Sequence, residues 1–320
     1  MGSALLGARC PVVYLIPLQP APDLEEVDVQ ITQLIFNILT RASELALIGI
    51  SLTLVYDLLD FASFAQNSFA TLGAYLALLF SVGLGMPLIL AAVLAVIITG
   101  ILGMLTDRAI FQWLRESSAF IRMVASIGLA QGIRSMVQVF WGGQIKDYGL
   151  GVQEPLTILG ATVTPIRILI VVVAGVAMLG FHLFLHRTNL GRSIRATSDN
   201  RELAEATGID TERVVLYVWF LACAFAAIGG ILIGLETQLR PSMGQVILLA
   251  TFCVVILGGI GNVYGAMVGS LIFAAAENIG IAINIGGFQF PVRYKPALAF
   301  IVLILTLLIR PSGVLGRKES

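Results

Sequence analysis

The chain contains nine long apolar runs, and these runs indicate whether it folds in water or in a lipid bilayer. They cover residues 34–55, 62–83, 88–105, 120–141, 166–185, 214–235, 246–257, 266–285 and 296–309. A helix of about 20 apolar residues crosses the hydrocarbon core of a bilayer, and a spanning backbone must satisfy its own hydrogen bonds there. The sequence therefore predicts an all-α, polytopic transmembrane helical bundle with about eight to nine spans. The run 246–257 is too short to cross alone, so broken or short helices are expected.

Composition agrees with a lipid bilayer as the surroundings of the chain. Hydrophobic residues make up 58% and charged residues 12%, whereas soluble domains average about 25% charged residues. The sequence contains no basic patch of the kind that would indicate a nucleic-acid partner. The three cysteines, Cys10, Cys223 and Cys253, are an odd number, and the last two lie inside apolar runs. These two are expected to be small buried hydrophobic residues, and no disulfide is expected. His182 and His186 lie four residues apart without an acidic third ligand nearby, so no metal or cofactor is expected.

Motifs for catalysis do not occur in the sequence. The phosphate-binding loop Gly-x-x-x-x-Gly-Lys-Ser/Thr is not found. An intramembrane enzyme would need a nucleophile with its base, or a metal cluster, and the sequence offers neither. We therefore expect no enzyme, and any ATP hydrolysis that drives this chain has to come from a separate ATPase.

Basic residues between the fifth and sixth runs predict the orientation of the chain. Segment 187–213 holds Arg187, Arg192, Arg195, Arg201 and Arg213. By the positive-inside rule this segment is cytoplasmic, and counting spans places the C-terminal tail 311–320 on the same side. The remaining divisions are an N-terminal tail, 1–33, and one transmembrane domain, 34–310. The external segment 142–164 is rich in Gly and is expected to be a turn-rich loop with room for a short hairpin.

The basic segment is too long and too regular for a simple connector. Asp199 or Asn200 is placed to cap a short helix that contains Leu203 and Ala204, and Gly208 suits its C-terminal stop. A short exposed helix between two spans has the shape to dock into a groove on a cytoplasmic partner. A solvated connector with well-made caps is the alternative.

Four stretches of the chain carry a resemblance to a known family. They are 47–75, with Ser63-Phe64-Ala65-Gln66-Asn67; the basic segment, with Gly191-Arg192-x-x-Arg195-Ala196; 255–277, with Gly258-Gly259-Ile260-Gly261; and 310–317, which begins Arg310-Pro311-Ser312-Gly313. These stretches resemble branched-chain amino acid ABC transporter permeases of the LivH/LivM family. The resemblance extends over about residues 34–317.

The resemblance implies a role and a set of partners. The chain would be the membrane-spanning permease subunit of an ATP-binding-cassette importer for branched-chain or related amino acids, located in the cell membrane. Its partners would be a second permease subunit or homologous copy, two ATP-binding subunits and an extracytoplasmic solute-binding protein. Contact with the ATPase is then expected at Arg195, Ser198, Asp199, Asn200, Arg201, Glu202, Leu203 and Ala204. A stand-alone secondary transporter or channel is the alternative, and it would not need the basic segment.

A polar interruption before the second run is the first candidate for the substrate pathway. Ser63, Gln66, Asn67 and Ser68 offer neutral donors and acceptors at a helix start, where free N–H groups and the helix dipole favour a carboxylate. The family usually reads Asn-Phe-Ala-His-Gly at 63–67, and this chain departs from that pattern at three of the five positions. Urea or a short-chain amide therefore stays an alternative substrate. A capped polar helix start without a ligand is the alternative structural interpretation.

A glycine-rich stretch and one acidic residue complete the candidates for the pathway. Gly258 and Gly259 permit an unwound turn whose carbonyls could line a cavity. The spacing of Gly261, Gly265 and Gly269 predicts a face for close helix packing. Glu277 lies inside a run and is expected either to line the pathway or to bond a neighbouring helix.

Other ionisable residues within the runs have simpler interpretations. Arg41 and Glu44 are three apart and are expected to neutralise each other. Arg122 and Arg134 are predicted near the two ends of one span, where their side chains can extend toward the membrane surface.

Overall fold

Helices make up almost all of the described structure. The computed structural model describes residues 24–151, 154–158, 161–282, 295–310 and 312–316. Its elements are α1 Leu24–Leu59, α2 Ala65–Leu78, a π-helical turn Leu79–Gly83, α3 Leu88–Thr106, a π-helical turn Asp107–Phe111, a 3-10 turn Gln112–Leu114, α4 Ala119–Trp141, β1 Leu156–Ile158, β2 Ala161–Val163, α5 Pro165–Arg187, α6 Asn189–Asp199, α7 Arg201–Ala206, α8 Thr211–Glu236, α9 Met243–Gly258, α10 Val263–Ala282 and α11 Lys295–Ile309. The prediction of an all-α membrane bundle is confirmed.

Each of the nine apolar runs coincides with a helix, from α1 to α5 and from α8 to α11. Six helices of the described part are long and apolar enough to cross a membrane, and α9 is one of the shorter ones. Residues 283–285 of the eighth run lie outside the described residues. The expected hairpin in segment 142–164 is confirmed, because β1 pairs with β2 in antiparallel register.

The first helix begins earlier than the sequence predicts. Helix α1 starts at Leu24, inside the segment 1–33 that we expected to be a tail. Residues 1–23 of that tail lie outside the described residues, as do 311 and 317–320 of the C-terminal tail.

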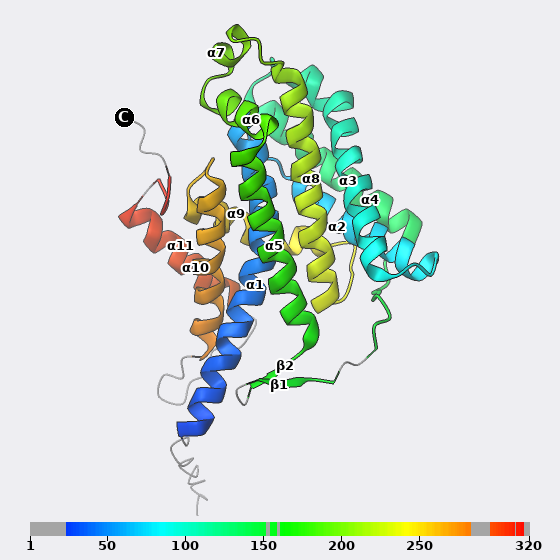
Figure 1. Cartoon of the computed structure of the whole chain (residues 1–320), viewed down its shortest axis with the longest axis vertical. Helices are drawn as coiled ribbons and strands as arrows, with labels where there is room; N and C mark the ends of the chain where they lie inside the picture. Colours follow the sequence, from blue (N-terminus) through cyan, green and yellow to red (C-terminus); the bar gives the residue numbers. More distant parts are fainter. Residues whose placement is uncertain (1–23, 152–153, 159–160, 283–294, 311, 317–320) are drawn as a thin grey trace, which may run out of the picture.

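Two ends of the bundle can be recognised in Figure 1. Helices α6 and α7 lie at one end, which we call the α6–α7 end. Strands β1 and β2 lie at the opposite end, which we call the hairpin end.

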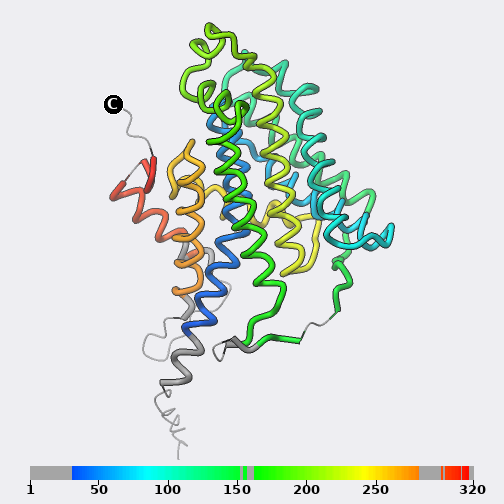
Figure 2. The backbone as a smooth tube through the Cα atoms, viewed as in Figure 1, coloured from blue at the N-terminus to red at the C-terminus, as the bar shows by residue number. Residues whose placement is uncertain are grey.

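Burial separates central helices from peripheral ones. In the most apolar window of α1, 83% of residues are buried, whereas the figure for α4 is 17%. Helices α1 and α8 run side by side through the bundle (Figure 2), and α2 packs on α8. The outward faces of α3, α4 and α5 carry large apolar side chains such as Ile89, Val139 and Val176. Such faces suit lipid rather than water.

Glycines allow α2 and α8 to approach closely. A Cβ atom at Gly230 of α8 would lie 1.9 Å from the carbonyl oxygen of Ala70, and one at Gly73 of α2 would lie 2.5 Å from the Cβ of Ala227. Small residues at helix interfaces permit this backbone contact in membrane proteins. The position of α2 therefore depends on glycine, which has no side chain, at positions 73 and 230.

This packing can be tested with Gly230→Ala. We expect the substitution to destabilise the protein by about 1–3 kcal/mol, because the methyl group has no space against the α2 backbone. The measurement is the thermal unfolding midpoint of the detergent-purified protein. Gly175→Ala in α5 is the matched control, since a Cβ there would meet nothing within 4 Å. The control should be neutral or stabilising by up to about 1 kcal/mol, and equal effects of the two variants would contradict the packing argument.

Candidate functional site

The chain turns back into the bundle between α1 and α2. Helix α1 ends at Leu59, and Asp60 follows with a φ of 50°. Phe64, which precedes α2, donates its N–H to Ser126 Oγ of α4 at 3.1 Å, and no side chain caps the first turn of α2. The predicted pathway residues Ser63, Gln66, Asn67 and Ser68 are all buried. The start of α2 thus lies inside the bundle and not at its surface.

Several side chains at this helix start lack partners. Gln66 Oε1 accepts hydrogen bonds from Ser51 Oγ at 2.9 Å and from Cys223 Sγ at 3.8 Å. Gln66 Nε2, Ser63 Oγ and Asn67 Oδ1 have no hydrogen-bond partner in the described protein. An unpaired buried polar group costs about 1–3 kcal/mol. We call Ser51, Ser63, Gln66, Asn67 and Thr71 the polar cluster.

Helix α9 also begins beside the polar cluster. The N–H of Gly244, in its first turn, donates to Thr71 Oγ1 at 2.9 Å. A Cβ at Gly244 would lie 2.3 Å from the carbonyl oxygen of Asn67. Two helix N-termini, with their partial positive charge, therefore meet at the polar cluster. This arrangement suits a ligand with a carboxylate and neutral polar neighbours.

The structure does not bring Gly258 and Gly259 to this cluster. They lie at the other end of α9, about 21 Å from Gly244 along the helix axis. Their carbonyl neighbourhood is closed by the C-terminal segment, since Val314 N–H donates to Leu257 O and Leu315 N–H donates to Gly258 O, both at 2.9 Å. These hydrogen bonds occupy the carbonyls of Leu257 and Gly258, and a pathway role of Gly258 and Gly259 stays a prediction. Local sequence could not reveal a contact with a segment more than 50 residues away.

The three predicted packing glycines separate into two groups. A Cβ at Gly265 would lie 2.5 Å from Gly258 O, and one at Gly269 would lie 2.2 Å from Val254 O, so both face α9. Gly261 lies instead in the turn before α10, with a φ of 79°. Glycine is suited to this residue because the backbone has a left-handed conformation there, and not because a neighbouring helix packs against it.

Glu277 belongs to a buried ion cluster and not to the polar cluster. Its Oε2 atom accepts from Arg41 Nε at 3.2 Å, and Arg41 Nη1 lies 3.5 Å from Glu44 Oε2. The sequence predicted the pair of Arg41 with Glu44. A bond from Glu277 to a neighbouring helix was one of the two expectations for that residue, but Arg41 was not predicted as its partner. Nearby, Arg167 of α5 lies 3.2 Å from Glu236 of α8. These pairs stabilise the contacts of four helices.

The basic segment forms two capped helices at the α6–α7 end. Asn200 Oδ1 accepts from Leu203 N–H at 3.0 Å and caps α7, and Gly208 follows it with a φ of 89°. These caps confirm the expected short helix. Helix α6 was missed, although Thr188 caps it by accepting from Gly191 N–H at 3.0 Å. The signal was available in the Thr188 cap and in the spacing of the buried residues Ile194 and Thr197.

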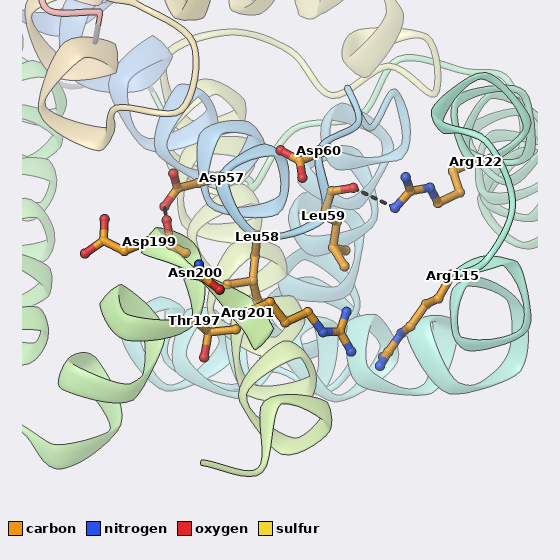
Figure 3. A pocket seen from close by; sticks show the side chains of 11 residues that line it. Asp57, Leu58, Leu59, Asp60, Arg115, Arg122, Thr197, Asp199, Asn200 and Arg201 are labelled. Atoms are coloured by element: carbon orange, nitrogen blue, oxygen red, sulfur yellow. Dashed lines mark hydrogen bonds between the residues drawn. The ribbon is translucent and has the colours of Figure 1, made fainter. Parts of the chain in front are cut away.

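A cavity of about 290 Å³ separates α6 and α7 from the ends of α1 and α4 (Figure 3). Four of the residues expected to contact the ATPase line it, namely Ser198, Asp199, Asn200 and Arg201. Ser198 Oγ donates to Asp57 Oδ2 of α1, and Arg122 Nη1 donates to the Leu59 carbonyl at 2.7 Å. The cavity therefore connects the basic segment to the start of the α1–α2 turn.

The other residues expected at the ATPase contact lie outside this cavity. Arg195 Nη1 on α6 lies 3.4 Å from His186 Nδ1. Ala204 is buried, whereas Glu202 and Leu203 are exposed on α7. Leu203 is 63% exposed, which makes it the apolar side chain that α7 presents outward.

An ion network fixes α7 to the membrane helices. Arg201 Nη2 lies 2.8 Å from Glu212 Oε1 at the start of α8, and Arg115 pairs with the other oxygen of Glu212. Arg115 Nη2 also lies 2.7 Å from Asp107 Oδ2. A hydrogen bond from Thr211 and the Arg201 guanidinium hold the pKa of Glu205 below its usual range. Sequence spacing gave no signal for this network, because its members lie on three separate segments.

The ion cluster can be tested with Glu277→Gln. We expect a loss of about 1.5–3 kcal/mol in stability, since a hydrogen bond to a charged group is removed from a buried site. Arg41→Gln combined with Glu277→Gln should destabilise less than the sum of the two single changes, because the residues form one pair. Thermal unfolding of the purified protein measures each value. Arg213→Gln, in the exposed pair with Asp210, is the control and should change stability by less than about 1 kcal/mol.

Comparison with known proteins agrees with this geometry. Residues 34–307 match the family described as branched-chain amino acid transport system / permease component. The chain is 31% identical over 301 residues to the high-affinity branched-chain amino acid transport system permease protein BraD of Pseudomonas aeruginosa, covering 90% of this chain and 96% of that protein. It is 30% identical over 306 residues to the permease protein LivH of the same kind of system in Escherichia coli, with the same coverage. A probable branched-chain amino acid transport permease protein LivH of Methanocaldococcus jannaschii is 28% identical over 283 residues, covering 85% of this chain and 88% of that protein. The chain therefore belongs to the permease family of branched-chain amino acid transport systems.

Proposed function

We propose that this chain is a permease subunit of an ATP-driven importer, and that branched-chain amino acids cross the membrane along the polar cluster. The observation that carries the proposal is the burial of the α2 start together with unpaired atoms of Ser63, Gln66 and Asn67. Groups that are under-satisfied inside a membrane bundle mark a solute pathway. The relatives BraD and LivH are named for branched-chain amino acid transport, which favours this substrate over urea or short-chain amides.

The polar cluster offers chemistry that fits an amino acid without holding it tightly. The N-termini of α2 and α9 attract a carboxylate. The unpaired Nε2 of Gln66 can donate to the carboxylate or to water, and the unpaired Oδ1 of Asn67 can accept from the ammonium group. No charged residue belongs to the cluster, so a zwitterion would be released easily. The described conformation, with these side chains buried, corresponds to a closed pathway.

The α6–α7 end is proposed to face the cytoplasm and to bind an ATPase. Its arginines follow the positive-inside rule. The network of Arg115, Glu212 and Arg201 joins α7 to α8 and to the turns that follow α3. Movement of α7 by an ATPase would thus displace two membrane helices. We further propose a second permease subunit or copy, two ATP-binding subunits, and a solute-binding protein that docks at the hairpin end.

The role of the polar cluster can be tested with Gln66→Met. The new side chain keeps the volume and removes the unpaired Nε2 atom, but it also removes the oxygen that accepts from Ser51 Oγ. Thermal stability should therefore fall by no more than about 1–3 kcal/mol, and the protein should still fold. Uptake of labelled leucine by the reconstituted complex should fall by about tenfold or more, because a polar contact with the passing solute is lost. Reduced stability with normal uptake per folded protein would show a structural role only. Thr53→Val in α1 is the control, since its buried hydroxyl is also unpaired but does not belong to the polar cluster.

The docking role of α7 can be tested with Leu203→Ser. Burial of a leucine side chain contributes about 1.5–3 kcal/mol to an interface, so ATPase binding should weaken by about 10–100-fold. Co-purification of the ATPase and ATP-dependent uptake measure the effect. Leu156→Ser at the hairpin end, with a 50% exposed side chain, is the matched control and should keep both. If Leu203→Ser binds the ATPase normally, α7 is only a connector.

A further inference from the structure

Helix α4 carries a polar face that the polar cluster does not use. Gln131, Ser135 and Gln138 are all exposed, and their spacing of four and three residues puts them on one side of the helix. Met136 and Phe140, on the opposite side of the helix, are also exposed and are apolar. The helix therefore has one side suited to lipid and another side that is not. We call Gln131, Arg134, Ser135 and Gln138 the polar face of α4.

Arg134 is held at this face by amide groups alone. Its Nη1 atom donates to Gln245 Oε1 of α9 at 2.5 Å, and Gln245 Nε2 donates to Gln131 Oε1 at 3.3 Å. Among the ion pairs of the described residues, none joins Arg134 to a carboxylate. The two glutamines orient the guanidinium without neutralising its charge.

The depth of Arg134 makes this unpaired charge informative. It lies seven residues before Trp141, the last residue of α4, which is about 10 Å along the helix. The sequence suggested a position near the end of the span, where the side chain could extend to the membrane surface. In the structure its side chain bonds Gln245 instead. A charge inside the membrane faces protein or a water-filled path, because lipid cannot solvate it.

Two further features favour an anion beside Arg134. Helix α9 begins at Met243, so its positive end lies two residues from the glutamine that holds the guanidinium. On α4, a Cβ at Gly128 or Gly132 would meet nothing within 4 Å. The backbone next to Gln131 is thus open to an approaching molecule.

We propose that the polar face of α4 lines the solute pathway and that Arg134 binds the carboxylate of the amino acid as it passes. Gln138 and Ser135 supply acceptors for the ammonium group. This inference rests on the proposed function, with the second permease subunit as the opposite wall of the pathway. Two other anions could meet the guanidinium, a carboxylate of that second subunit or a lipid phosphate, and the experiments below separate them.

The first experiment compares Arg134→Gln and Arg134→Lys with the control Arg240→Gln, an exposed arginine at the hairpin end. Each is placed in the full complex in liposomes, and leucine uptake, subunit assembly and basal ATPase activity are measured. We expect Arg134→Gln to lower the maximal uptake rate by about tenfold or more with assembly and basal ATPase activity retained. Arg134→Lys should recover part of the loss, and Arg240→Gln should equal the unaltered complex. Loss of assembly in Arg134→Gln would show an ion pair with the second subunit, and unchanged uptake would show a lipid contact; either overturns the proposal.

The second experiment asks whether the face meets water. Gln138→Cys and Phe140→Cys are made in a Cys10→Ser background, where the native Cys223 and Cys253 are buried. A cationic, membrane-impermeant methanethiosulfonate should label Gln138→Cys in the complex, more slowly with leucine and its binding protein present, and should leave Phe140→Cys, on the opposite side of the helix, unlabelled. Equal, low labelling of both would overturn the inference. Absence of leucine uptake by the unaltered complex would overturn the proposed function itself, and the labelling would still decide whether this face meets water.

Discussion

Close contact between α2 and α8 is the constraint on which the rest of this structure depends. Gly230 and Gly73 let the two backbones meet, and the short α2 is thereby held inside the bundle. Because α2 starts there, its uncapped first turn needs polar neighbours that a lipid-facing helix start could not have. The position of this first turn explains why the polar residues Ser63, Gln66 and Asn67 are found inside the bundle. The polar cluster is thus a consequence of where one helix begins.

Paired and unpaired polar groups occupy different places in the bundle. Arg41 with Glu277, and Arg167 with Glu236, are ion pairs between helices. Opening either pair would leave charges without partners, which is strongly unfavourable in a membrane. The polar cluster gains partners when water or a solute enters, since Gln66 and Asn67 have atoms without hydrogen bonds. The ion-paired contacts are therefore expected to stay closed while the polar cluster opens.

Local interactions made much of the fold predictable, and long-range ones did not. The apolar runs, the Asn200 cap and the Gly208 stop depend on residues within a few positions of one another, so their pattern is visible in the sequence. The Arg41 pair with Glu277 joins residues 236 positions apart, and spacing carries no information about it. The hydrogen bonds of Leu257 and Gly258 with the C-terminal segment could not be predicted for the same reason, since that segment is distant in the chain. Arg134 was predicted near a span end, with its side chain extended toward the membrane surface. Its hydrogen bond with Gln245 joins residues 111 positions apart, so the sequence could not reveal it.

Helix α9 connects the regions that these contacts define. Its first turn touches α2 through Gly244 and Thr71, and the next residue, Gln245, holds Arg134. Its last residue lies in the turn closed by Leu315, and a Cβ at Gly261 in that turn would lie 3.5 Å from Asp57, the carboxylate bonded by Ser198 of α6. The first turn of this short helix therefore contacts the polar cluster and the polar face of α4. The turn that follows its last residue lies beside Asp57, which is bonded to the basic segment. A helix that is too short to span the membrane can shift as a unit, so the polar cluster and the polar face of α4 would change together when α6 moves.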